Sequence, residues 1–185
     1  MAHNSCGQLN QLINDLLDTE RLASGKMRFD IQAVTLLPIL EQSITQIAAM
    51  QYKQRLVIRC DKDTPDRVLA DKGRLSQVCL NLLSNAVRFS PPDSTVEITL
   101  SEHNKLIRVS IVDQGNGVAG EFLPQLFQRF AQADNQDSRQ HAGTGLGLAI
   151  SKALIEQMAG QIGYERRQQG SCFYFELPAA TPDPA

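Results

Sequence analysis

Two segments of the chain read as β-hairpins, and they limit the folds that the rest of the chain can adopt. In the first, the stretches TVEITL (95–100) and KLIRVSIVD (105–113) flank a turn at 103–104. In the second, GQIGYER (160–166) precedes SCFYFEL (171–177). Alternation of apolar and polar residues indicates strands that bury one face. Because hairpin strands are antiparallel, we expect a largely antiparallel sheet with one side to be covered.

Apolar residues at helical spacing predict four helices that can cover this sheet. The first spans about 8–23, and the second begins after Thr35, which is a suitable N-cap. The third runs from its cap, Asp71, to about Phe89, and the fourth covers about 146–159. Shorter runs predict strands at 28–32, 55–60 and 67–70. The sequence therefore predicts an α+β two-layer sandwich, in which helices pack on one face of a mixed, mostly antiparallel sheet.

Composition argues against several classes of function. The 185 residues suit one globular domain, and 18 basic against 20 acidic residues give a net charge of -2. Such a balance, with no Trp and few aromatic residues, disfavours partners such as nucleic acid and an anionic membrane surface. The four cysteines lie far apart, which disfavours a metal cluster or a disulfide framework and indicates reduced thiols in a cytoplasmic setting.

The third predicted helix carries a polar face. Asn81, Asn85 and Arg88 fall at i, i+4 and i+7, so they project from one side. Two amide oxygens and a cation suit a hydrated divalent ion that is bridged to phosphates. An ordinary solvated helix face remains the alternative. The opposite side forms a predicted buried stripe of Leu75, Val78, Leu82, Ala86 and Phe89.

A second polar feature follows the strand that ends at Asp113. A carboxylate at a strand end can accept a hydrogen bond from an amino group in a cleft, and Gly115 and Gly117 let a flat ring approach the backbone. The alternative is a tight turn, because Asp and Gly are common turn residues. The pattern Gly115-x-Gly117-x-x-Gly120 also imitates a Rossmann loop. We reject that interpretation because no second parallel strand follows.

The third feature is the stretch HAGTGLGLAI (141–150), in which Gly143, Gly145 and Gly147 lead directly into a helix. A helix N-terminus offers free N–H groups and the positive end of the helix dipole to an anion. We therefore expect phosphates to approach this backbone. The polar run at 131–142 is long for a passive connection, which indicates a lid.

Taken together, these stretches resemble the catalytic ATP-binding domain of bacterial sensor histidine kinases, within the gyrase, Hsp90, histidine kinase and MutL superfamily. NLLSNAVRFS is similar to the N box, DQGNGV to the first glycine box, GTGLGLAISK to the second glycine box and GSCFYFELP to the closing strand. LFQRF, with Phe127 and Phe130, resembles the phenylalanine box that anchors the lid. The lid resembles that of hybrid sensor kinases, and the resemblance implies the Bergerat ATP-binding fold.

The resemblance also implies roles for individual residues. Asn81 and Asn85 would hold Mg2+ and orient the triphosphate of ATP. Arg88, where the family usually has Lys, would contact phosphate and complete the expected catalytic set. Asp113 would accept a hydrogen bond from the adenine amino group. The other residues expected to bind ATP are Gly115, Gly117, Val118, Phe130, Gly143, Thr144, Gly145, Leu146, Gly147, Leu148 and Cys172.

Besides Arg88, three features depart from the family pattern. Ala142 replaces a frequent glycine, and Cys172 stands where Thr is common near the adenine. The family's phosphoacceptor histidine lies in a segment like H-E-L-R-T-P, and no such segment surrounds His3, His103 or His141. We therefore expect the acceptor histidine to be absent from this chain, which would be a piece of a larger kinase.

The resemblance covers about residues 30–178, and LINDLLDTERLASGKM resembles the second helix of the dimerisation and phosphotransfer domain. We expect residues 1–27 to be a remnant of that domain, 28–178 the catalytic ATP-binding domain, and 179–185 a disordered tail. The expected partners are the histidine-containing dimerisation domain of the kinase and a response-regulator receiver, with no direct membrane contact. The chain alone is expected to be a monomer or a weak homodimer.

Two other functions compete with this interpretation. One is an ATPase of the gyrase, Hsp90 or MutL kind. Those relatives activate water with a carboxylate on the N-box helix, where this chain has Asn81, and an amide cannot act as a base. The other is a non-catalytic nucleotide-binding interaction module, which the complete set of motifs disfavours.

Overall fold

The computed structural model describes residues 2–60, 64–132 and 144–180, with side chains described from residue 12 onward. Its centre is a five-stranded sheet with the order β2-β4-β5-β7-β6. Only β2 and β4 are parallel, and the other neighbours are antiparallel. The strands are β2 (Arg55–Arg59), β4 (Thr95–His103), β5 (Leu106–Val112), β6 (Gln161–Arg166) and β7 (Ser171–Pro178).

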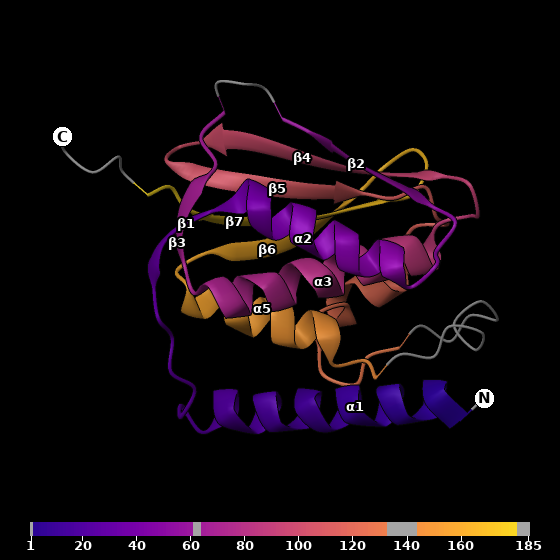
Figure 1. Cartoon of the computed structure of the whole chain (residues 1–185), viewed down its shortest axis with the longest axis horizontal. Coiled ribbons are helices and arrows are strands. Elements are labelled where there is room, and N and C mark those ends of the chain that lie inside the picture. Colours follow the sequence, from indigo (N-terminus) through magenta and orange to yellow (C-terminus); the bar gives the residue numbers. More distant parts are fainter. Residues whose placement is uncertain (1, 61–63, 133–143, 181–185) are drawn as a thin grey trace.

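Helices cover one face of this sheet (Figure 1). They are α2 (Leu36–Ala49), α3 (Lys72–Phe89) and α5 (Gly147–Gln157). Beside them, β1 (Gln32–Thr35) and β3 (Arg67–Ala70) form a separate antiparallel pair. A 3-10 helix, η1 (Gly120–Gln125), follows β5. The predicted α+β class, with helices on one face of a mixed and mostly antiparallel sheet, is confirmed.

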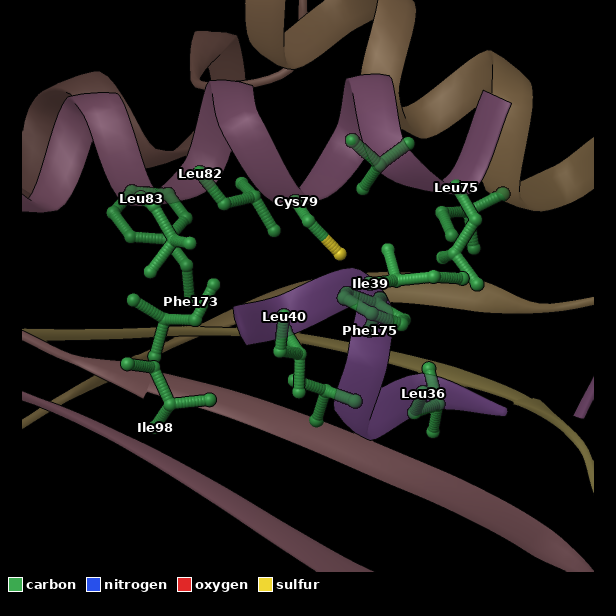
Figure 2. Packing of buried hydrophobic residues seen from close by; sticks show 14 of the residues in the cluster. Leu36, Ile39, Leu40, Leu75, Cys79, Leu82, Leu83, Ile98, Phe173 and Phe175 are labelled. Atoms are coloured by element: carbon green, nitrogen blue, oxygen red, sulfur yellow. The ribbon is translucent and has the colours of Figure 1, made fainter. Parts of the chain in front are cut away.

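The core lies between the helices and the sheet. Figure 2 shows Leu75, Cys79, Leu82 and Leu83 of α3 pointing toward α2 and toward strand residues such as Phe175. Each of these side chains is at most 1% exposed. Burial of one such leucine contributes about 1.5–3 kcal/mol, so this packing fixes α3 firmly against the sheet. Four residues of the predicted stripe on α3 are buried as expected.

The fifth residue of that stripe was predicted wrongly. Phe89, the last residue of α3, is 50% exposed, because the covering core ends after Ala86 and Val87, which are still buried in the same turn. The strand predicted at 28–32 is also displaced, since pairing begins at Gln32, opposite Ala70 of β3. The predicted hairpins are confirmed, although the first turn falls at Asn104 and Lys105, which have positive φ angles of 51° and 63°.

The chain continues in ordered contact just past β7. Ala179 pairs with Val68, and the N–H of Ala180 donates to the carbonyl of Arg67 at 2.9 Å. The first two residues of the predicted disordered tail therefore pack against β3. The last five residues lie outside the described part of the chain.

Helix α1 (Ala2–Ala23) lies alongside α5, on the side away from the sheet (Figure 1). It turns a polar side to the domain. Asp15 is 5% exposed, and its carboxylate accepts a hydrogen bond from Thr144 at 3.1 Å. Asp18 accepts from Gln77 at 2.8 Å and pairs with Arg74 at 3.4 Å. An apolar stripe of α1 is 45–49% exposed: Leu12, Ile13, Leu16 and Leu17, of which Leu17 also lines a hollow between α1 and α3.

Candidate functional site

Asp113 occupies the first loop position after β5, and its carboxylate is almost fully buried, with 3% of the residue exposed. Its Oδ1 accepts hydrogen bonds from the backbone N–H of Gly115 at 2.9 Å and of Ser171 at 3.1 Å. Burial raises the pKa of this carboxyl above its ordinary value, although the two backbone donors act in the opposite direction. Both backbone donors bind Oδ1, and the Ser171 side chain also hydrogen-bonds the carboxylate, so a donor on a ligand would add to these partners.

Two glycines allow the backbone to close around Asp113. A Cβ on Gly115 would overlap the carbonyl oxygen of Phe89, so only glycine fits between the Asp113 loop and the end of α3. Gly170 has φ +84°, and a Cβ there would overlap the carbonyl of Asp113. The sequence placed Gly170 only in a turn. Its role depends on a contact between β5 and β7, which no local pattern reveals.

The remainder of the first glycine box is fixed by a tyrosine that the sequence did not single out. The backbone N–H of Val118 donates to the hydroxyl of Tyr164 at 3.1 Å. The Tyr164 ring packs edge-on against Phe173, with the ring centroids 5.3 Å apart. Gly117 has φ +73° and lies beside Gly170. Strand β6 therefore holds the loop that follows Asp113.

Asn81 forms the other end of the candidate site. Its Nδ2 donates to the hydroxyl of Ser151 on α5 at 2.9 Å. A Cβ on Gly147 would overlap Oδ1 of Asn81, and it would lie 2.9 Å from Cγ. The first turn of α5 thus rests directly on this amide. Asn85 and Arg88 are half-buried on the same face of α3, and Arg88 forms no ion pair within the described part of the chain.

The second glycine box makes close contacts with protein atoms. Gly145, with φ +70°, accepts a hydrogen bond from the N–H of Phe130 at 2.9 Å. The hydroxyl of Thr144 accepts from the N–H of Leu146 at 3.2 Å. We expected phosphates alone to explain these glycines. That explanation is incomplete, because the Phe130 backbone and the Asn81 amide already exclude a side chain at Gly145 and Gly147.

Other predicted site residues occupy varied environments. Leu146 is buried and Leu148 is half-buried at the start of α5. Phe127 packs against the core, whereas the ring of Phe130 is 65% exposed, so any anchoring by Phe130 comes from its backbone. Cys172 is fully buried on β7, opposite Val112. Gly143 and almost all of the predicted lid lie outside the described residues.

Helix α3 connects the two ends of the site. Phe89 lies against Gly115 beside Asp113, and Asn81 lies against the first turn of α5. Phe89 lies eight positions after Asn81 on α3, which corresponds to a rise of about 12 Å along the helix axis. The arrangement suits a ligand with a flat polar ring at one end and anionic groups at the other. A hollow of about 430 Å³ lies elsewhere, between α1 and the start of α3, and it is lined by Asp18, Arg21 and Arg74 among others.

Comparison with known proteins identifies the family of this chain. Residues 70–181 match the family described as "Histidine kinase-, DNA gyrase B-, and HSP90-like ATPase". The chain belongs to this family. It is an ATP-binding catalytic domain of the sensor histidine kinase type, with the Bergerat fold.

Among curated relatives, sensor protein GacS of Pseudomonas syringae pv. syringae is 37% identical over 188 residues, which cover 97% of this chain and 21% of the relative. Signal transduction histidine-protein kinase BarA of Escherichia coli K12 is 35% identical and covers 94% of this chain and 20% of the relative. Hybrid signal transduction histidine kinase B of Dictyostelium discoideum is 36% identical, over 95% of this chain and 9% of the relative. The chain thus spans about a fifth of GacS and of BarA.

Solved structures of histidine kinases have the same fold. Full-length ShkA in complex with AMPPNP has a TM-score of 0.82 and 32% identity, over 97% of this chain and 37% of that one. Histidine kinase ThkA in complex with response regulator TrrA has a TM-score of 0.72 and 21% identity, over 96% of this chain and 49% of that one, which shows a shared fold.

None of the helices in residues 2–60, 64–132 and 144–180 is long and apolar enough to cross a bilayer.

Proposed function

We propose that this chain binds ATP with its adenine at Asp113 and its triphosphate between Asn81 and the start of α5. One observation carries the proposal: α3 lies against the loop of the buried Asp113 carboxylate at Phe89 and against the first turn of α5 at Asn81, about 12 Å earlier along the helix. Asp113 accepts a hydrogen bond from the adenine amino group, and the free N–H groups of the first turn of α5 bind phosphate oxygens. Arg88 supplies positive charge from the same face of α3.

The amides on α3 fit a magnesium ion. Oδ1 of Asn81 lies directly against Gly147, where a Cβ would overlap it, and this oxygen accepts no hydrogen bond from the described residues. Amide oxygens are hard neutral ligands, and Mg2+ usually combines a few such ligands with water and phosphate. Asn81 and Asn85 would therefore hold the ion. Held there, Mg2+ would supply positive charge that neutralises the negative charge developing during phosphoryl transfer.

We further propose that the γ-phosphoryl group is transferred to a histidine that is absent from this chain. The chain's own residues contribute positioning and electrostatic stabilisation, which are the main requirements of this chemistry. Residues 1–27 are proposed to belong to the dimerisation and phosphotransfer domain, and 28–178 to the catalytic domain. The exposed apolar stripe of α1 is then the surface for the missing histidine-bearing helix. The ThkA–TrrA complex supports a response-regulator receiver as a further partner.

An ATPase of the gyrase type fits less well. Such an enzyme needs a base on the N-box helix to activate water, and the amide of Asn81 cannot accept that proton. Its Nδ2 is in addition engaged by Ser151.

The proposal is tested by incubating the chain with γ-labelled ATP, with and without an added fragment that carries a histidine acceptor helix. We expect label on the fragment that is stable in alkali and lost in acid, and no label on the chain itself. Asp113→Ala should reduce the labelling. Stoichiometric, acid-labile label on the chain alone would place an acceptor among its own three histidines and overturn the proposal.

A further inference from the structure

Ser151 is a buried polar residue for which the proposed function gives no role. It lies on α5, one turn after Gly147, and is 1% exposed. Its hydroxyl oxygen accepts the hydrogen bond from Nδ2 of Asn81 at 2.9 Å. This bond joins two helices across 70 residues of sequence, at the end of the site proposed to hold the phosphates.

The bond matters because an amide side chain has two different ends. Nδ2 can only donate hydrogen bonds, whereas Oδ1 accepts them or binds a cation. With Nδ2 held by Ser151, Oδ1 lies against the backbone of Gly147. A rotation of the amide by 180° would direct the NH₂ group toward the metal site and remove one ligand.

Ser151 alone does not select between these two orientations, because a hydroxyl can either donate or accept. The start of α5 supplies the second constraint. Its positive dipole end favours the oxygen over the NH₂ group, and Oδ1 lies so close to Gly147 that a Cβ there would overlap it. The orientation that satisfies both neighbours keeps Nδ2 on Ser151 and Oδ1 at the phosphate end.

We propose that Ser151 is a positioning residue, which holds the amide of Asn81 so that Oδ1 faces the divalent cation bound with the nucleotide. The inference rests on the proposed function. Ser151 touches neither nucleotide nor metal. It acts through Asn81, so its loss should weaken the contribution of the metal and leave metal-free nucleotide binding intact.

The test compares Ser151→Ala with the parent chain by calorimetric titration of ATP, first with a chelator and then with Mg2+. We expect equal affinities without metal. With Mg2+, we expect Ser151→Ala to bind about three- to tenfold more weakly, the range for loss of one hydrogen bond. Ser151→Thr, which keeps the hydroxyl, should restore most of the Mg2+-dependent gain.

Ser43→Ala is the matched control, because Ser43 is also a buried helical serine, 2% exposed, and its hydroxyl donates to the carbonyl of Ile39 in its own helix. Ser43→Ala should leave the Mg2+-dependent gain in ATP affinity unchanged. In an Asn81→Ala background, Ser151→Ala should have no further effect on the gain. The NMR signal of the Asn81 side-chain NH₂ should also shift in Ser151→Ala.

The outcomes separate the two proposals. If the parent chain binds ATP equally with and without Mg2+, the proposed metal site is wrong. If the parent gains affinity with Mg2+ and Ser151→Ala keeps the full gain, with an unshifted Asn81 signal, the role of Ser151 is refuted and the proposed function stands.

Discussion

Substitution of Gly147 by alanine tests the contact between α5 and the Asn81 amide. In the first turn of a helix, Gly→Ala ordinarily adds about 0.4–1 kcal/mol of stability, because it restricts the unfolded chain. Here the new Cβ would overlap Oδ1 of Asn81 and lie 2.9 Å from its Cγ. Overpacking of this kind costs about 1–3 kcal/mol. Displacing the amide also breaks its bond to Ser151, which costs about 0.5–1.5 kcal/mol more.

The costs exceed the gain, so we expect Gly147→Ala to lower the free energy of unfolding by about 1–3 kcal/mol. Urea unfolding at an unchanged m value is the assay. Gly73→Ala is the matched control, because Gly73 lies in the first turn of α3 and its Cβ would meet only Asp71, at an ordinary 3.5 Å. That variant should gain about 0.4–1 kcal/mol. A Gly147→Ala chain as stable as Gly73→Ala would refute the reasoning.

Three further predictions follow from buried carboxylates. Because burial raises the pKa of Asp113, its ionised form lowers the free energy of unfolding above that pKa, and this cost disappears as the pH falls below the ordinary value. Asp113→Asn should therefore unfold at a higher urea concentration than the parent at pH 7. The same variant should bind ATP about tenfold more weakly. Acidification from pH 7.5 through the raised pKa of Asp113 should weaken ATP binding in the parent more than in Asp113→Asn, as measured by calorimetry, and parallel profiles would contradict this. Asp15→Asn and Asp18→Asn should each accelerate hydrogen exchange in α1 without affecting the sheet, whereas the exposed Glu20→Gln should not.

Local sequence patterns, such as helix caps and alternating strands, predicted much of the fold. The cap at Asp71 is present, since its carboxylate accepts from the N–H of Arg74 at 3.0 Å. Both hairpins formed because alternating strands flanked short turns. The parallel pairing of β2 with β4 was not predicted, since it joins segments that α3 separates. The exposure of Phe89 was missed because periodicity does not show where the covering core ends.

The candidate site was only partly accessible to prediction from the sequence. Asp113 and Asn81 stood out by residue type and spacing. Ser151, Tyr164 and Gly170 did not, because each acts through a contact between distant segments: 70 residues separate Asn81 from Ser151, and 46 separate Val118 from Tyr164. Such contacts are properties of the folded sheet and its helices, and no local pattern encodes them.

The central claim is that the buried carboxylate of Asp113 accepts a hydrogen bond from the amino group of adenine. Calorimetric titration of the parent chain with ATP and with GTP tests it directly, because guanine presents a carbonyl oxygen where adenine presents its amino group. One charge-assisted hydrogen bond contributes about 1.5–3 kcal/mol, so ATP should bind roughly ten- to a hundredfold more tightly than GTP. Equal affinity for the two nucleotides would contradict the assignment of Asp113.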